Sequence, residues 1–131
     1  MDIHGEPITL SRFQGNPLVV KFWERICPSC RDEIPELSAL QREYKGRGLT
    51  VLGIALEEDP VRVREFLIAY EAHYPVVLGR EQGIGLMKMF GNEGALLPYT
   101  LIIDREGEVV LRKVGAFKKS DFQEVAEKLL R

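Results

Sequence analysis

Short apolar runs rich in β-branched and aromatic residues alternate along this chain with segments of helical periodicity, and this alternation constrains the fold most strongly. The runs are typical of buried strands and occupy residues 17–23, 49–56, 74–79, 99–104 and 108–115. Because helical segments separate the first three runs, their strands are expected to be parallel, with right-handed crossovers. The last two runs are joined by Arg105-Glu106-Gly107, which predicts a hairpin with Gly107 at positive φ.

Two helices are predicted between the first three strands. The first begins at Pro28 and ends near Tyr44, and Pro35 inside it predicts a kink. The second begins after Asp59, a favourable N-cap, with Pro60 at its first position. Its apolar stripe is expected to comprise Phe66, Leu67 and Tyr70.

Two further helices are predicted in the second half of the chain. Residues 83–90 form a short one, and the last begins at Ser120, where Gln123 completes a capping-box pattern. Together the elements predict an α/β fold, with one domain over residues 1–131. A central mixed β-sheet is expected to carry helices on both faces and the hairpin at one edge.

Composition and charge argue against several classes of protein. The 131 residues are 45% hydrophobic and 29% charged, and the formal net charge of −2 comes from mixed signs. Without a basic stripe, a nucleic-acid partner is not expected. No apolar run approaches membrane-spanning length, and the N-terminus has no signal-peptide core. A cytosolic protein and a mature chain that has lost its leader both fit these observations.

The two cysteines, Cys27 and Cys30, are the strongest candidates for chemistry. Cys27 follows the first strand by a short loop and Pro28 opens the next helix, so the Cys27 sulfur is expected at a helix N-terminus. Unpaired N–H groups and the helix dipole favour a thiolate at that position. Cys30, one turn later, would be placed to displace a mixed disulfide. The pair is therefore interpreted as a redox centre that needs no metal and no bound cofactor.

Three other uses of the cysteine pair are weaker. A structural zinc ion takes four ligands, and only His4 and His73 could complete the set, neither at zinc-finger spacing. A passive disulfide would close a loop too short to remove much chain entropy. Two inert buried thiols fit poorly with the turn-forming residues Pro28 and Ser29 between them.

The segment FWERICPSCRDEIPEL resembles the active-site segment of thioredoxin-fold proteins, most of all the TlpA/ResA/CcmG group of bacterial extracytoplasmic thiol–disulfide oxidoreductases. The shared features are Phe-Trp, Cys-Pro-x-Cys and Pro35 five residues after the second cysteine. GEPITLSRFQGNPLVV is similar to the family's N-terminal β-hairpin, GLTVLGIALEED to the strand before its inserted helix, and LLPYTLIIDREGEVV to its cis-proline segment. The resemblance extends from about Gly5 to Leu130 and implies a thioredoxin-like fold.

The resemblance also implies roles for single residues. Cys27 would be the exposed nucleophile, Cys30 the buried resolving thiol and Pro98 the cis-proline beside the disulfide. The Leu97 backbone would pair with an incoming peptide, and Glu58 would relay a proton to or from Cys30. The implied substrate-binding residues are Trp23, Ile26, Pro28, Leu97 and Pro98.

Two of these roles have plainer alternatives. Glu58 also fits a solvated acidic turn at a helix start, beside Glu57 and Asp59. Without the family context, Pro98 would be an ordinary trans proline that opens a strand.

The chain departs from the family directly before Cys27. Ile26 stands where the family usually has a tryptophan, and Glu24 and Arg25 precede it. Arg25 would help to hold a thiolate at Cys27, whereas Glu24 would oppose it. This rim is expected to contact the partner, so the resemblance does not determine which partner is reduced. The run FGNEGALLP before the cis-proline is also longer than usual.

The sequence therefore predicts a thiol–disulfide oxidoreductase that reduces protein disulfides, with cytochrome c maturation as the family-level setting. The expected electron donor is a membrane carrier of the DsbD/CcdA type outside the cytoplasm, or a thioredoxin system inside it. The bacterial periplasm or the extracytoplasmic face of the membrane is the expected location, with the cytoplasm as the alternative. We expect a monomer.

Two other functions occur on the same scaffold. A peroxiredoxin places a threonine three residues before its peroxidatic cysteine, but Glu24 holds that place for Cys27, and Cys27 itself holds it for Cys30. A Sco-type copper chaperone spaces its cysteines one residue further apart and adds a distant histidine, which His73 does not match. A redox-silent partner-binding domain would not need two active-site cysteines.

Overall fold

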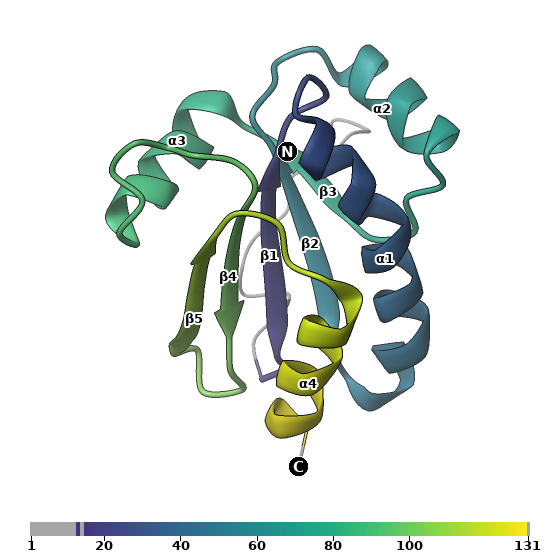
Figure 1. The fold of residues 1–131 in the computed structure, drawn as a ribbon, viewed down its shortest axis with the longest axis vertical. Coiled ribbons are helices and arrows are strands. Elements are labelled where there is room, and N and C mark those ends of the chain that lie inside the picture. Colours follow the sequence, from purple (N-terminus) through teal and green to yellow (C-terminus); the bar gives the residue numbers. More distant parts are fainter. Residues whose placement is uncertain (1–12, 14, 131) are drawn as a thin grey trace.

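The computed structural model describes residue 13 and residues 15–130, which form a five-stranded sheet covered by helices (Figure 1). The strands are β1 (Leu18–Trp23), β2 (Thr50–Ala55), β3 (Val76–Leu78), β4 (Tyr99–Ile103) and β5 (Val109–Val114). The helices are α1 (Pro28–Tyr44), the 3-10 turn η2 (Lys45–Arg47), α2 (Pro60–Ala69), α3 (Arg80–Met89) and α4 (Lys119–Leu129). The predicted order of strands and helices is confirmed.

The sheet is mixed, and its strand order is β3-β2-β1-β4-β5. The central strand β1 runs parallel to β2 and antiparallel to β4, so that Val19 lies opposite both Val51 and Ile102. Strands β4 and β5 form the predicted hairpin at one edge, with Gly107 at a φ of 85°. The predicted N-terminal β-hairpin falls largely outside the described residues.

Strand β1 is buried along its whole length because helices cover both of its faces. Val20 and Phe22 pack in a cluster with Met87 of α3. Val19 packs on the opposite face in a second cluster with Leu40 of α1 and Phe122 of α4. Burial of each such side chain stabilises the fold by about 1.5–3 kcal/mol. The predicted covering of both faces is therefore confirmed, and it explains the uninterrupted apolar run.

Helix α2 packs beside the cysteines through two residues of the predicted stripe, Leu67 and Phe66, and through Val63, which was not predicted. Val63 and Leu67, four residues apart on one helical face, are buried against Trp23 and Cys30. The expected burial of Tyr70 is wrong, because this residue follows the last turn of the helix and is 37% exposed.

Two helix starts also differ from prediction. Helix α4 begins at Lys119, because the Asp121 carboxylate accepts a hydrogen bond from the Lys118 N–H at 3.2 Å. The predicted capping box at Ser120 and Gln123 is therefore wrong. Helix α3 begins at Arg80, three residues before the predicted start. Helix α1 continues through Pro35, which is exposed.

Candidate active site

The connection between β1 and α1 places the first cysteine at the start of a helix. The Cys27 N–H donates to the Glu24 carbonyl at 3.2 Å, which closes a tight turn directly after β1. Cys27 is the N-cap of α1 in an extended conformation, and Pro28 is the first helical residue. The prediction of a cysteine sulfur at a helix N-terminus is confirmed.

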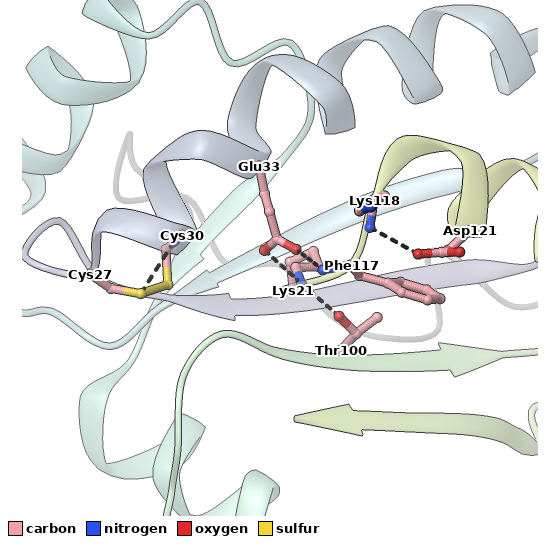
Figure 2. A network of polar contacts seen from close by, with 8 residues as sticks. All are labelled: Lys21, Cys27, Cys30, Glu33, Thr100, Phe117, Lys118 and Asp121. Atoms are coloured by element: carbon pink, nitrogen blue, oxygen red, sulfur yellow. Dashed lines mark hydrogen bonds and ion pairs between the residues drawn. A yellow bond between two sulfur atoms is a disulfide. The ribbon is translucent and has the colours of Figure 1, made fainter. Parts of the chain in front are cut away.

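Cys27 and Cys30 form a disulfide whose Cα atoms are 5.2 Å apart (Figure 2). The Cys30 N–H donates to the Cys27 Sγ at 3.2 Å, so this sulfur receives a backbone donor of the first turn. Cys30 is 2% exposed, whereas Cys27 is only half-buried. The sulfur that a partner can reach is therefore that of Cys27, and a thiolate at this position would be stabilised by the helix start.

The segment before β4 lies against the hydrophobic cluster that contains Cys30 and Trp23. The Leu97–Pro98 peptide bond is cis, as predicted. Pro98 is buried, and its carbonyl accepts a hydrogen bond from the Gly115 N–H at 2.9 Å. Leu97 is half-buried and packs against the cluster that contains Cys30. The structure therefore brings the predicted cis-proline segment to the cysteine pair.

Trp23 packs in the buried cluster next to Cys30. Its side chain is 3% exposed, belongs to the cluster of Cys30, and stacks on Phe66 with a centroid distance of 5.7 Å. Such burial leaves no surface for direct contact with a protein substrate, so the expected substrate-binding role of Trp23 does not fit. Ile26 and Pro28, in contrast, are both exposed beside Cys27.

Two charged residues predicted to act on the cysteines are placed differently: Arg25 is paired elsewhere, and Glu58 is exposed as in the plainer alternative. The Arg25 guanidinium, expected to stabilise a Cys27 thiolate, forms an ion pair with Glu57 instead. Glu58 is exposed in the connection between β2 and α2, and within the described part of the chain it makes no hydrogen bond or ion pair. Its proposed proton transfer stays a prediction.

Sequence reasoning missed a buried polar network between β1 and α1, to the right of the disulfide in Figure 2. Lys21 of β1 and Glu33 of α1 are 2% and 4% exposed, and Nζ lies 2.9 Å from Oε1. The Lys21 ammonium also donates to the Thr100 hydroxyl at 2.6 Å. The second Glu33 oxygen accepts the Phe117 N–H at 2.8 Å. The available signal was a lysine inside an otherwise apolar strand.

This network joins the cysteine helix to the rest of the core. Glu33 lies three residues after Cys30 on α1, and its contacts reach β1 and the segment before α4. Burial lowers the pKa of Lys21, although the neighbouring Glu33 carboxylate favours the charged form. Burial, reinforced by the Glu33 charge, raises the pKa of Tyr74 well above its ordinary range.

The described residues offer little to a metal ion. Among residue 13 and residues 15–130, no group of three or more His, Cys, Asp and Glu side chains could hold one. The side chain of His73 is exposed, and its backbone N–H donates to the Ser38 hydroxyl at 3.0 Å. His4 lies outside the described residues.

In the same described ranges, every helix is too short or too polar to cross a membrane.

Comparison with known proteins gives a consistent family. The thiol-disulfide oxidoreductase ResA of Halalkalibacterium halodurans is 29% identical over 126 residues, which cover 96% of this chain and 69% of that protein. A thioredoxin-family thiol:disulfide interchange protein of Chlorobium tepidum superposes with a TM-score of 0.89 at 28% identity, covering 100% of this chain and 91% of the other. A putative thiol:disulfide interchange protein DsbE from Chlorobium tepidum gives 0.84 at 25% identity, covering 95% and 86%.

The resemblance to thioredoxin-fold thiol–disulfide oxidoreductases is confirmed by these relatives, and the thioredoxin-like fold by the superpositions. The Redoxin family model matches residues 1–129, nearly the whole chain. This chain therefore belongs to the Redoxin family.

Proposed function

We propose that this chain is a thiol–disulfide oxidoreductase that reduces protein disulfides through Cys27 and Cys30. The observation that carries the proposal is the position of the Cys27 sulfur, which caps α1 and accepts the Cys30 N–H at 3.2 Å. A sulfur in this position is stabilised as a thiolate, which is the form that attacks disulfides.

The reaction proceeds by two exchanges of a disulfide bond. The thiolate of reduced Cys27 attacks one substrate sulfur, a Cys27–substrate mixed disulfide forms, and the second substrate sulfur leaves as a thiolate that takes up a proton. Cys30 then loses its proton and attacks the Cys27 sulfur. The mixed disulfide breaks, the substrate leaves as a dithiol, and the chain retains the Cys27–Cys30 disulfide after transferring two electrons. An external dithiol donor must reduce this disulfide again.

The residues around the disulfide supply the proposed substrate contacts. Ile26 and Pro28, the two neighbours of Cys27 in the chain, are exposed, and Leu97, directly before the cis-proline, packs against the cluster that contains Cys30. An extended peptide would pair with the Leu97 backbone as a short added strand. Glu58 is proposed to exchange a proton with Cys30, either directly or through water.

The setting of the reaction is proposed from the family alone. Proteins resembling this chain are named ResA and DsbE, so we propose a role in reducing haem-site disulfides of apocytochrome c outside the cytoplasm. The proposed electron donor is a membrane carrier of the DsbD/CcdA type, with a thioredoxin system as the alternative if the chain works in the cytoplasm.

Reduction of insulin disulfides in the presence of dithiothreitol tests the reaction. The wild-type chain should accelerate it, Cys27→Ser should abolish the acceleration, and Cys30→Ser should accumulate a mixed disulfide visible by mass spectrometry. Full activity of Cys27→Ser would contradict the proposed nucleophile. Stoichiometric Cu(I) binding without reductase activity would favour the copper-chaperone alternative.

A further inference from the structure

The turn before Cys27 is held by a side chain from the segment that follows β2. Because the Cys27 N–H bonds to the Glu24 carbonyl, Arg25 and Ile26 are the two central residues of this turn. The Arg25 N–H donates to Glu57 Oε2 at 2.8 Å, and the Arg25 Nε donates to the other oxygen of the same carboxylate. Glu57 thus binds both the backbone and the side chain of one turn residue.

The carboxylate comes from a rigid part of the molecule. Glu57 follows Leu56, whose N–H donates to the Trp23 carbonyl at 2.9 Å and so extends the pairing of β1 with β2. The side chain of Glu57 is 12% exposed and that of Arg25 is 30% exposed. The Glu57 carboxylate therefore accepts one charge-assisted bond from the Arg25 guanidinium and one bond from the Arg25 backbone. Two bonds to one residue in a partly buried place orient the turn more strongly than a single ion pair on the open surface.

This arrangement determines what the turn presents to a partner. The positive charge of Arg25 is balanced by Glu57, so it is not free to attract an acidic substrate. The next residue, Ile26, is 83% exposed and directly precedes Cys27. Ile26 belongs to none of the hydrophobic clusters of the described residues, so the position of its side chain follows mainly from the turn backbone. Holding the turn in advance removes an ordering cost that would otherwise accompany binding.

We propose that Glu57 is a positioning residue for substrate recognition: by holding Arg25 it fixes Ile26 as an apolar contact beside Cys27. The site then selects protein disulfides flanked by apolar, uncharged side chains. This inference rests on the proposed function, because the selected partner is the disulfide substrate that Cys27 attacks.

The test uses two disulfide-bonded peptides that differ only in the residue beside one cysteine, leucine or aspartate, together with hydroxyethyl disulfide as a small substrate. Glu57→Gln keeps the size of the side chain but removes its charge and one of its two acceptors. We expect KM for the leucine peptide to rise about five- to tenfold, as for the loss of one ordinary hydrogen bond, because the change acts on the substrate only through the turn. In Glu57→Gln the rate with hydroxyethyl disulfide and the reduction potential should not change. The control variant Glu65→Gln changes an exposed residue of α2 and should behave as wild type.

A second comparison separates positioning from general stability. In an Ile26→Ala background, Glu57→Gln should produce no further rise in KM, because both changes remove the same contact. An unchanged KM in Glu57→Gln, an equal change for both peptides, or a shifted potential would each overturn the inference. If the wild type reduces none of the three disulfides, the proposed function fails. The positioning role can be tested even in that case: Glu57→Gln should accelerate hydrogen exchange of the Arg25 backbone amide, which bonds to Glu57. Unaltered exchange would overturn the positioning role of Glu57.

Discussion

Replacing Glu33 with glutamine would leave Lys21 as a buried cation without its anion. The two side chains are almost inaccessible to solvent, and the Lys21 Nζ lies 2.9 Å from Glu33 Oε1. A glutamine side chain can still accept the Phe117 N–H that Glu33 accepts at 2.8 Å. The substitution therefore removes a charge and preserves most of the packing.

The cost of this change has an upper limit, because Lys21 can lose its proton. Its ordinary pKa is 10.5, so deprotonation at pH 7 costs about 5 kcal/mol at about 1.4 kcal/mol per pH unit. Removing one partner of a buried ion pair typically costs about 3–5 kcal/mol. We therefore expect Glu33→Gln to lower the free energy of unfolding by about 3–5 kcal/mol at pH 7.

The same reasoning predicts the sign of the pH dependence. In the folded variant Lys21 is neutral, whereas in the unfolded chain it is protonated up to its ordinary pKa of 10.5. The unfolded state then binds one more proton, so stability rises with pH by about 1.4 kcal/mol per unit from pH 7 towards pH 10. Burial lowers the pKa of Lys21 in the wild type as well, but the Glu33 carboxylate opposes this shift, so the stability of the wild type rises less with pH than that of the variant.

Urea unfolding of the oxidised proteins, followed by the fluorescence of Trp23, measures both effects. Trp23 is the only tryptophan and is 3% exposed, so its emission reports the opening of the core. Glu65→Gln, which changes an exposed carboxylate, is the matched control. A loss below about 1 kcal/mol, or a loss that does not shrink as pH rises, would refute the reasoning about a buried cation.

Three further substitutions test polar side chains that hold the backbone. Gln41→Leu removes bonds of 2.9 and 2.7 Å to backbone groups at the start of β2, and should lower the free energy of unfolding in urea by about 2–4 kcal/mol. Asn92→Ala removes two bonds to the backbone of Leu96, at 2.9 and 3.1 Å, and should raise KM for insulin without changing the rate with hydroxyethyl disulfide. Ser38→Ala removes two bonds of 3.0 Å between α1 and the segment before β3, and should lower the midpoint of urea unfolding by an amount equivalent to about 1–2 kcal/mol. Unchanged urea midpoints for the first and third variants, or an unchanged insulin KM for the second, would contradict these roles.

Local patterns in the sequence were sufficient for most of the fold. Strand and helix order follow from apolar periodicity, and the positive φ at Gly107 follows from its place in the hairpin. The cysteine at a helix start is equally local, since Cys27 and Pro28 are adjacent. The errors at Tyr70 and Ser120 lie at helix ends, where one tertiary contact or one alternative cap changes the boundary.

The contacts that shape the site could not be read in the same way. Arg25 bonds to Glu57 across 32 residues, and Phe117 bonds to Glu33 across 84. Each pair joins segments that meet only after the sheet has formed. In the sequence, Glu33 and Glu57 look no different from the exposed glutamates near them. Lys21 gave the clearest signal, because a charge inside a fully buried strand requires a partner.

A redox titration of the Cys27–Cys30 pair against dithiothreitol and glutathione tests the central claim most directly. The proposal predicts one two-electron couple in the range of thioredoxin-like reductants, roughly −200 to −270 mV. The reduced chain should then transfer its two electrons to insulin at a rate that depends on Cys27. A pair that cannot be reduced in this range, or a reduced pair that leaves insulin oxidised, would contradict the claim.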